Sequence, residues 1–333
     1  MKALQFIALH HAELVDLPVP SPAPDEVLIR VDAAGVCHTD LEILSGNYPA
    51  RFPVVPGHEF AGQVVEVGSA VAGAWLGTPV AVDPLVPCGN CSWCHAGRIN
   101  LCDSLRAYGA ELNGGAAEYV AVRAANLVDA SGLPAGVAAL AEPLACAENG
   151  AARAVIAAGE EILVVGAGPI GLLIMTAFGN RGAKLFVAEP QAERRGTARA
   201  FGSLGEHDSV LAALKARDGA QFDVVVDVTG RPEVVQQAFQ AVRKGGRFLL
   251  FGVCPPNSKL LLDPYDIYKR EISVLGSFSL NRTITTAVDS LRASSFPLDT
   301  LITNQLPLSE MPLGLELLGR PGVLKVQISP QQR

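Results

Sequence analysis

The stretch EILVVGAGPIGLLIMTAF, residues 161–178, restricts the fold of this 333-residue chain more than any other segment does. An apolar run leads into a glycine-rich turn, and an apolar stretch with helical character follows at once. Gly166 allows the tight turn, Gly168 lets the backbone approach a phosphate, and Gly171 lets the helix pack on the strand. Because the N-terminus of such a helix attracts anions, the pattern predicts a dinucleotide pyrophosphate site.

The next apolar run, KLFVAE, ends at Glu189, 18 residues after Gly171. An acid at this spacing reaches the adenosine ribose hydroxyls and would repel a 2′-phosphate, which favours NAD over NADP. Arg194 and Arg195 lie close enough in sequence to keep NADP open. A glycine-rich turn that binds no nucleotide is the alternative, and the combination of strand, helix and acid disfavours it.

The chain has two regions with different sequence patterns. Residues 1–149 contain short runs of period two between Gly and Pro residues, which predict antiparallel strands closing into a barrel-like or sandwich domain. Residues 150–280 alternate strand and helix patterns, which predict a parallel sheet covered on both faces; a helix is expected over 231–246 and a last strand over 271–279. Residues 281–333 are expected to pack back on the first domain. The predicted fold class is α/β plus β.

Composition excludes several kinds of partner. A formal net charge of −7 offers no basic surface for a nucleic acid or an anionic membrane. The N-terminal sequence lacks the pattern of a secretion signal, and the longest apolar stretch is interrupted by three Gly and a Pro. The seven cysteines are odd in number and mostly clustered, which favours metal ligation over disulfides. A soluble, cytoplasmic protein is expected.

Four cysteines with the spacing C-x2-C-x2-C-x7-C form the densest cluster: Cys88, Cys91, Cys94 and Cys102. Four thiolates make a closed tetrahedral zinc site, with no position left for water or substrate. Such a site stabilises a loop and is poorly suited to catalysis. A redox dithiol is the competing interpretation, which four thiols disfavour.

An open metal site needs other residues, and three segments carry suitable donors: GVCHTD with Cys37, His38, Thr39 and Asp40, PGHEF with His58 and Glu59, and AEPLACAE with Glu142, Cys146 and Glu148. A mixed set of thiolate, imidazole and carboxylate leaves a position for water or an alcohol oxygen, as catalytic zinc requires. Sequence spacing alone does not bring the three segments together. Any one of these residues by itself is more often structural than a ligand.

The order of these motifs along the chain resembles that of the zinc-dependent medium-chain dehydrogenases, and most closely their sorbitol/arabinitol dehydrogenase-like branch. The motifs are GVCHTDLEILSG, PVVPGHEFAGQVVEVG, the four-cysteine loop, LAEPLACA and VVGAGPIGLL. The likeness runs from near the N-terminus to about residue 320. It implies a GroES-like β-barrel catalytic domain, a Rossmann domain with a doubly wound parallel sheet, two zinc ions per chain, NAD, and a homodimer or homotetramer.

The resemblance also implies a set of metal ligands. Cys37 and His58 correspond to the first two ligands of the catalytic zinc. Glu142, in the EPL segment, corresponds to the third, where classical alcohol dehydrogenases have a cysteine. Glu59 binds the metal itself in this branch or exchanges with Glu142 and water, while Cys146 corresponds to a position nearer the nicotinamide.

Further roles are implied around these ligands. Asp40 corresponds to the acid that orients His58, and Thr39 to the hydroxyl through which the substrate proton leaves. Two positions depart from the family pattern: Glu42 stands where the family often has the His that ends this proton path, and Glu148 where many polyol enzymes have His. The implied cofactor contacts lie at the pyrophosphate, the ribose and the nicotinamide half: Gly166, Gly168, Pro169, Ile170, Gly171, Glu189, Arg194, Thr229, Val253 and Ser277.

The resulting expectation is a zinc-dependent dehydrogenase that transfers a hydride from a secondary hydroxyl of a polyol or sugar alcohol to NAD and yields the ketone. Glu142 favours this branch over the simple alcohol dehydrogenases. A primary or secondary alcohol, a cyclitol or threonine is the alternative substrate within the same chemistry. From other classes, a zinc-free NAD(P)-binding reductase or sensor and a zinc-bearing nucleic-acid module remain, both with less support. The walls of the substrate pocket cannot be read from the sequence.

Overall fold

The computed structural model describes residues 1–332, which divide into two compact units. The first comprises Met1–Pro143, Ile284–Ala293 and the chain from Leu298 onward; the second comprises Leu144–Thr283 and Ser294–Pro297. The predicted boundaries at 149/150 and 280/281 are therefore displaced by a few residues. The first displacement arises because α4 (Ala141–Ala154) is one continuous helix that begins in the first unit and continues into the second.

The first unit is built on a seven-stranded sheet whose order is β16-β17-β3-β4-β5-β9, with β8 also paired to β3. Most neighbours are antiparallel, as the period of two predicted, and β16 with β17 is the parallel exception. The strands are β3 (Glu26–Val36), β4 (Glu59–Val67), β5 (Pro79–Val82), β8 (Tyr119–Arg123), β9 (Leu127–Asp129), β16 (Ile302–Pro307) and β17 (Lys325–Ser329).

Smaller elements complete this unit. Two short antiparallel pairs are formed by β1 (Lys2–Ala8) with β2 (His11–Asp16), and by β6 (Leu85–Val86) with β7 (Arg106–Ala107). Its helices are α1 (His38–Ser45), α2 (Ser92–His95), η1 (Ile99–Leu101), η2 (Ala124–Asn126), α3 (Ala135–Ala138), α10 (Ile284–Ala293), η4 (Leu298–Leu301), η5 (Leu308–Glu310) and α11 (Met311–Leu317).

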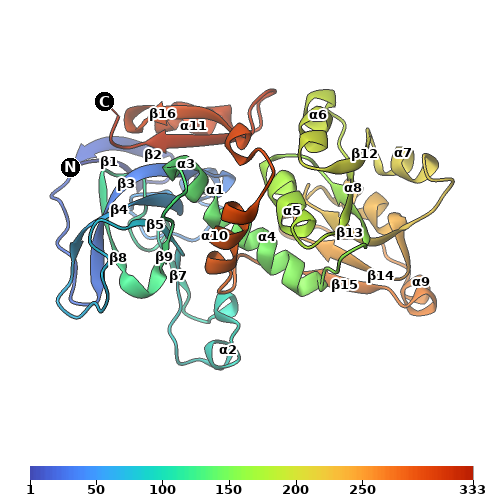
Figure 1. Cartoon of the computed structure of the whole chain (residues 1–333), viewed down its shortest axis with the longest axis horizontal. Coiled ribbons are helices and arrows are strands. Elements are labelled where there is room, and N and C mark those ends of the chain that lie inside the picture. The colour runs from blue at the N-terminus through green and yellow to red at the C-terminus, as the bar shows by residue number, and fades with distance from the viewer. Residues whose placement is uncertain (333) are drawn as a thin grey trace. The chain divides into compact units, whose positions relative to one another are not determined.

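The C-terminal segment contributes two strands to the first unit. β17 pairs with β3 in antiparallel register, with Val326 opposite Val36 and Ile328 opposite Ala34. The red strands and α11 of Figure 1 accordingly lie with the blue N-terminal strands. Val326 and Ile328 are buried in the same core as the side chains of β3 and β4, so this segment is an integral part of the unit.

The second unit is a six-stranded parallel sheet of order β12-β11-β10-β13-β14-β15. This is the 3-2-1-4-5-6 order of the doubly wound dinucleotide-binding fold, which confirms the predicted parallel sheet. Its strands are β10 (Glu161–Val165), β11 (Lys184–Ala188), β12 (Ser203–His207), β13 (Phe222–Asp227), β14 (Val242–Leu250) and β15 (Ser273–Gly276). Its further helices are α5 (Pro169–Gly179), α6 (Ala192–Ala200), α7 (Val210–Lys215), α8 (Pro232–Ala238), η3 (Phe239–Ala241) and α9 (Pro264–Arg270).

The helix expected over 231–246 was wrong in its second half. α8 and η3 end at Ala241, and β14 starts at Val242, which is fully buried and pairs with Phe222 of β13. Two adjacent glycines follow, and Gly245 has φ +68, a conformation unsuited to a helix interior. Strand pairing and burial of Val242 therefore outweigh the helical pattern of the preceding residues.

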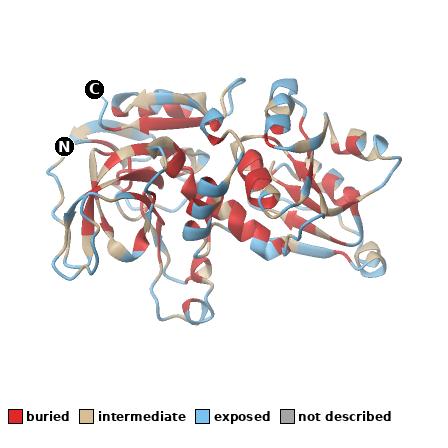
Figure 2. Ribbon diagram, in the orientation of Figure 1, coloured by how far each residue is buried: buried red, intermediate tan, exposed pale blue. Residues whose placement is uncertain are grey.

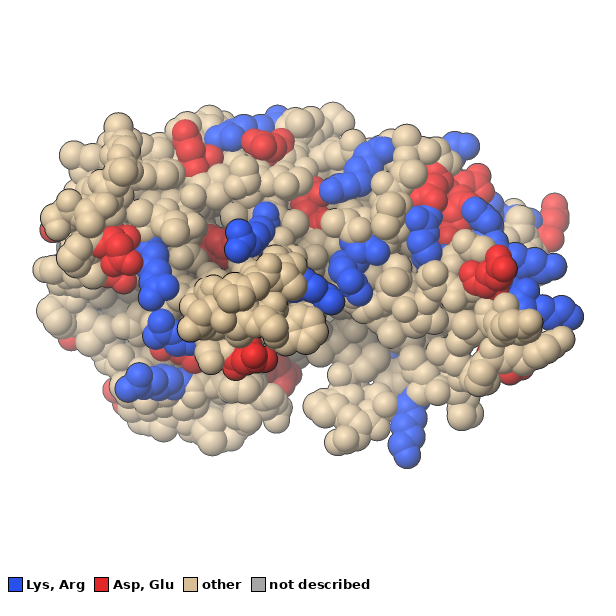
Figure 3. Space-filling view, turned by 90° about the horizontal axis from the view of Figure 1, so that it is seen from below, with Lys and Arg blue, Asp and Glu red and all other residues tan. Residues whose placement is uncertain are grey.

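The apolar stretch that opened the sequence forms the centre of the second unit. The side chains of β10 and of α5 are almost wholly buried, and α5 is largely red in Figure 2. Among the residues that the structure describes, no helix is long and apolar enough to cross a membrane. On the face drawn in Figure 3, acidic and basic side chains are interspersed.

Candidate metal and dinucleotide sites

Strand pairing in the first unit brings together donors from two of the three predicted segments. Cys37 follows the last residue of β3 and precedes α1, while His58 immediately precedes β4. Because Gly35 of β3 stands opposite Glu59 of β4, the two donor segments become neighbours. The ligand atoms of Cys37, His58 and Glu59 all lie within 4.8 Å of one another.

This donor set fits a zinc ion, since a thiolate, an imidazole nitrogen and a carboxylate oxygen are its usual ligands and three of them leave a position open. The electrostatics favour a cation as well. Burial lowers the pKa of His58, but the hydrogen bond with Cys37 and the negative charges of Cys37, Asp40 and Glu142 outweigh burial, so this pKa lies well above its ordinary value.

Asp40 lies behind these donors and is completely buried. One carboxylate oxygen accepts the backbone N–H of Cys37 at 2.9 Å, and the other accepts the N–H of Gly57 at 3.3 Å. The second oxygen is 3.9 Å from Nδ1 of His58, which is an electrostatic contact and too long for a hydrogen bond. Burial raises the pKa of Asp40. Asp40 therefore positions the site mainly by holding the backbone on both sides of it.

Glu142 lies near this cluster but outside it. It is in the first turn of α4 and is 7% exposed, and its charge raises the pKa of both His58 and Lys325. The carboxylate grouped with Cys37 and His58 is that of Glu59. The structure thus gives Glu59 the nearer position, where the resemblance implied Glu142 as the third ligand.

Lys325 is a residue at this site that the sequence did not single out. It begins β17 and is 6% exposed, and its Nζ contacts the carboxylate of Glu59, which is 1% exposed. The sequence did offer a signal, because Lys325 lies between apolar residues in the stretch VLKVQIS and a lysine in a buried strand needs an anionic partner. The partner itself could not be identified without the fold.

The residues implied in proton transfer lie on α1. Oγ1 of Thr39 is 3.7 Å from Sγ of Cys37. One turn along the helix, Glu42 accepts from Nε2 of His38 at 3.1 Å, and both side chains are exposed. Glu42, at the position where the family often has a single His, is therefore paired with the imidazole of His38 on the surface of α1.

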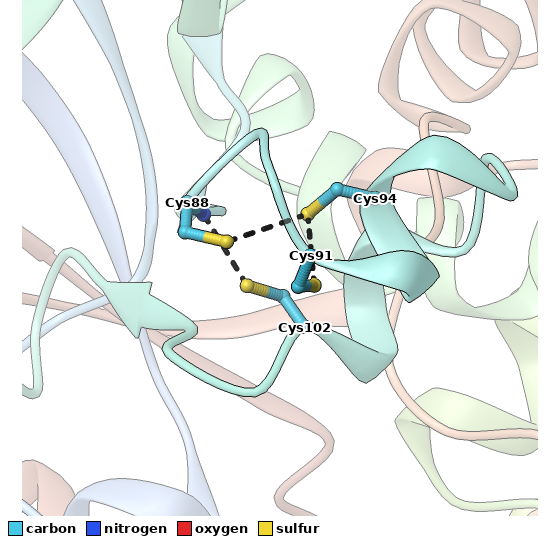
Figure 4. A group of neighbouring side chains, drawn as sticks. All are labelled: Cys88, Cys91, Cys94 and Cys102. Atoms are coloured by element: carbon cyan, nitrogen blue, oxygen red, sulfur yellow. Dashed lines mark hydrogen bonds between the residues drawn. The ribbon is translucent and has the colours of Figure 1, made fainter.

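The four cysteines of the loop converge, as Figure 4 shows. Sγ of Cys94 is 3.6 Å from Sγ of Cys91 and 3.9 Å from Sγ of Cys88, and the N–H of Cys88 donates to Sγ of Cys102 at 3.2 Å. Backbone N–H groups, that of Asp103 first, lower the pKa of Cys91 to about 6, whereas burial raises the pKa of Cys94 to about 12. The arrangement fits a closed, four-thiolate zinc site.

The glycine-rich turn has the geometry that its pattern predicted. Gly166 has φ +104, Gly168 caps α5, and Pro169 occupies the first turn, where its missing N–H costs nothing. A Cβ on Gly171 would lie 2.0 Å from the carbonyl oxygen of Gly166, so the helix packs against the turn more closely than any side chain allows. The N-terminus of α5, with Ile170 in its first turn, is the kind of helix end that binds anions.

Glu189, at the end of β11, is tied to this turn. Its carboxylate accepts the backbone N–H of Ala167 and that of Gln191, both at 2.9 Å, and the residue is 4% exposed. Each carboxylate oxygen keeps a further lone pair for a ribose hydroxyl. Arg195 donates to the carbonyl oxygens of Glu189 and Pro190, whereas Nη1 of Arg194 lies 3.8 Å from the Cβ position of Gly168 and so stands beside the phosphate turn.

The residues implied at the nicotinamide half share one sheet edge. Thr229, Val253 and Ser277 follow β13, β14 and β15, and the carboxyl ends of parallel strands meet where dinucleotides bind. Val253 is 92% exposed. Asp227, which the sequence did not single out, accepts from Oγ1 of Thr229 at 2.6 Å and from the N–H of Gly230 at 3.0 Å, and so holds this end of β13.

Two remaining residues of the third segment lie elsewhere. Glu148 is completely buried, and its carboxylate is 2.5 Å from the guanidinium of Arg181, within the second unit. This ion pair explains why an acid occupies the position. Among the described residues, Cys146 belongs to neither of the two donor clusters.

Comparison with known proteins agrees with this arrangement. Residues 23–132 match the alcohol dehydrogenase GroES-like domain, and residues 169–293 match the family called zinc-binding dehydrogenase. D-altritol 5-dehydrogenase of Agrobacterium fabrum is 41% identical over 99% of this chain and 100% of its own length. D-arabinitol dehydrogenase 1 of Uromyces fabae is 32% identical over 99% and 97%.

A solved structure shares the whole fold. The zinc-binding dehydrogenase of Sinorhizobium meliloti bound to NADP has a TM-score of 0.95 and 34% identity, over 99% of each chain. Relatives of this similarity and coverage share family, fold and cofactor class. The chain therefore belongs to the zinc-dependent medium-chain alcohol and polyol dehydrogenases and is an oxidoreductase whose cofactors are zinc and a nicotinamide dinucleotide.

Proposed function

We propose that this enzyme oxidises a secondary hydroxyl of a polyol or sugar alcohol to the ketone, with NAD as the hydride acceptor. The observation that carries the proposal is the cluster of Cys37, His58 and Glu59, whose donor atoms lie within 4.8 Å of one another. With Glu142 close by, this cluster is an open site, in contrast to the closed set of four cysteines.

Zinc bound at this cluster would act as a Lewis acid on the substrate hydroxyl. The chain's own residues have distinct tasks. Thr39, beside Cys37, would relay the hydroxyl proton by accepting it while releasing its own hydroxyl proton, and the pair of Glu42 and His38 would accept that proton and pass it to solvent. Asp40 holds the backbone of the donors in place.

The cofactor is held by the second unit. The N-terminus of α5 binds the pyrophosphate, and Glu189 binds the ribose hydroxyls. The negative charge of Glu189 supports NAD, while the NADP bound to the Sinorhizobium meliloti protein makes NADP the alternative. The names of the two sugar-alcohol dehydrogenases reported above support a polyol as substrate. A simple alcohol, a cyclitol or threonine is the second candidate.

We also propose a homodimer or homotetramer in the cytoplasm. β15 lies at one edge of the parallel sheet, and its Val274 and the following Phe278 are 39% and 54% exposed, which supports association at this edge. None of the seven cysteines forms a disulfide, which supports a reducing compartment.

The test is to follow NAD reduction with polyols, cyclitols, threonine and simple alcohols, and to measure zinc on the same sample. Turnover on polyols with about two zinc ions per chain is expected from one open and one closed site. C37A should lose the catalytic zinc and the activity, whereas C254A, outside both clusters, should keep both. One zinc per chain and no turnover with any compound would overturn the proposal.

A further inference from the structure

A buried ion pair lies directly behind the catalytic metal donors. Nζ of Lys325 is 2.6 Å from Oε1 and 2.5 Å from Oε2 of Glu59, and the two residues are 6% and 1% exposed. They are 266 positions apart in sequence and meet because β4 and β17 flank β3 on its two sides. One carboxylate therefore belongs both to the ion pair and to the donor cluster.

Gly35 provides the space in which the pair meets. A Cβ at this position of β3 would lie 2.1 Å from Oε2 of Glu59 and 2.9 Å from Cε of Lys325. The residue does not have a positive φ, so the backbone conformation does not require glycine. The absence of a side chain at Gly35 is instead what allows the carboxylate and the ammonium group to approach over β3.

Such a pair is not explained by stability. A buried ion pair is often no better than apolar residues of the same volume, because both charges must be desolvated. Val326 and Phe60, the neighbours of the two residues in sequence, are buried and apolar, while the charges of Cys37 and Glu142 also act on Lys325. The feature that sets the pair apart is that its carboxylate also faces Cys37 and His58.

We propose that Lys325 is a positioning residue that competes with the metal for the carboxylate of Glu59 and thereby sets the zinc affinity of the catalytic site. The inference rests on the metal site proposed above. With Lys325 in place, Glu59 is an exchangeable ligand, and the pair adds no net charge to the site. A ligand that can leave frees a coordination position for the substrate.

The charges predict an order of zinc affinities. K325M leaves Glu59 to the metal and should tighten zinc binding about tenfold or more, because a full negative charge close to the ion is released. E59Q leaves an unpaired ammonium group and should weaken binding by about the same factor. The double variant E59Q/K325M removes both charges and should stay within about threefold of the wild type. K325R, which keeps the charge, should also resemble the wild type.

The experiment is a chelator competition on the full chain, starting from metal-free protein. The four-cysteine site is an internal reference, since its affinity should be the same in all variants, and C37A identifies which phase belongs to the catalytic site. A second readout is the visible spectrum of the Co²⁺-substituted protein. Stronger binding by Glu59 in K325M should raise the coordination number and weaken the ligand-field bands.

Unchanged or weaker zinc binding in K325M would overturn the inference. If K325M does not fold, the comparison of E59Q with E59Q/K325M decides: removal of Lys325 from the E59Q protein must restore about tenfold in affinity, and equal affinities would show a purely structural pair. A wild-type chain that binds only one zinc would instead contradict the proposed function itself. If the wild type binds two zinc ions but the variants differ in zinc affinity in another order than predicted, this inference alone is overturned.

Discussion

Two glycines in this protein matter because they lack a side chain and so leave space for their neighbours. Gly35 makes room for the pair of Glu59 and Lys325, and Gly171 makes room for a helix against the carbonyl of Gly166. A side chain at Gly35 would keep Glu59 and Lys325 apart, and a side chain at Gly171 would keep α5 away from the glycine-rich turn. The sequence motif predicted the role of Gly171, whereas nothing in the sequence marked Gly35.

At this scale we predict that G171A destabilises the second unit and weakens NAD binding. A Cβ at residue 171 meets backbone, which cannot move away as a flexible side chain can, so we expect a loss of about 1–3 kcal/mol. The measurements are thermal unfolding and a fluorescence titration with NADH.

The matched control is G196A. Gly196 is also helical but exposed on α6, and a Cβ there meets nothing within 4 Å. Alanine should stabilise it by about 0.4–1 kcal/mol and leave NADH affinity unchanged. Equal effects of the two substitutions would contradict the steric account of Gly171.

At the scale of elements, the four-cysteine loop is a short segment that depends on metal for its structure. Its only regular elements are α2 and η1, of four and three residues. Segments this short do not hold together through their own hydrogen bonds. The four sulfur atoms nevertheless converge, so a bound zinc ion would hold the loop together through its four ligands.

We predict that the zinc affinity of this loop rises with pH. The pKa of Cys94 is raised to about 12, so this thiol is still protonated near neutrality and must lose its proton to bind zinc. Cys91, with a pKa of about 6, is already largely thiolate there. At least one proton is therefore released per zinc, and the affinity should increase about tenfold or more per pH unit around neutrality.

Chelator competition at several pH values measures this slope, with C37A used so that only the loop binds metal. An affinity independent of pH near neutrality would contradict the assignment of a protonated Cys94. C94A should lose the loop zinc altogether, and C254A should retain it.

At the scale of the whole molecule, the parallel sheet has two edge strands, and each carries an exposed apolar residue. β15 forms one edge and carries Val274, with Phe278 just beyond it, while β12 forms the other edge and carries the exposed Leu204. An exposed apolar edge strand invites pairing with a second copy. The residues near β15 include further exposed aromatic side chains, those of Tyr265 and Tyr268 on α9.

We predict that V274K converts the proposed oligomer to a smaller species, because it places a charge in the middle of the edge at which association is proposed. L204K, the same change on the opposite edge of the sheet, should leave the oligomer intact. Light scattering after size-exclusion chromatography distinguishes the two. A wild-type chain that is monomeric at all concentrations would refute association, and dissociation by L204K would place it at the other edge.

Several features could be predicted because their determinants are local. The glycine-rich turn, Glu189 and the parallel strands come from patterns within a few dozen residues, and the structure has the predicted doubly wound sheet. Where two local preferences competed, the prediction was wrong: residues after Ala241 continue a helical pattern but pair as β14. The unit boundary was displaced for a related reason, since α4 has no break at Pro143.

The sequence by itself determined which chemistries were available: a closed set of four thiols within 15 residues, a dinucleotide turn, and separate mixed donors for an open metal site. The tertiary structure decided how those donors are grouped. It placed Glu59 rather than Glu142 beside Cys37 and His58, and it brought Lys325 to the same carboxylate. The physical reason is that these neighbours are set by the register of β4 and β17 on β3, and strand register depends on the burial of whole strands rather than on any local pattern.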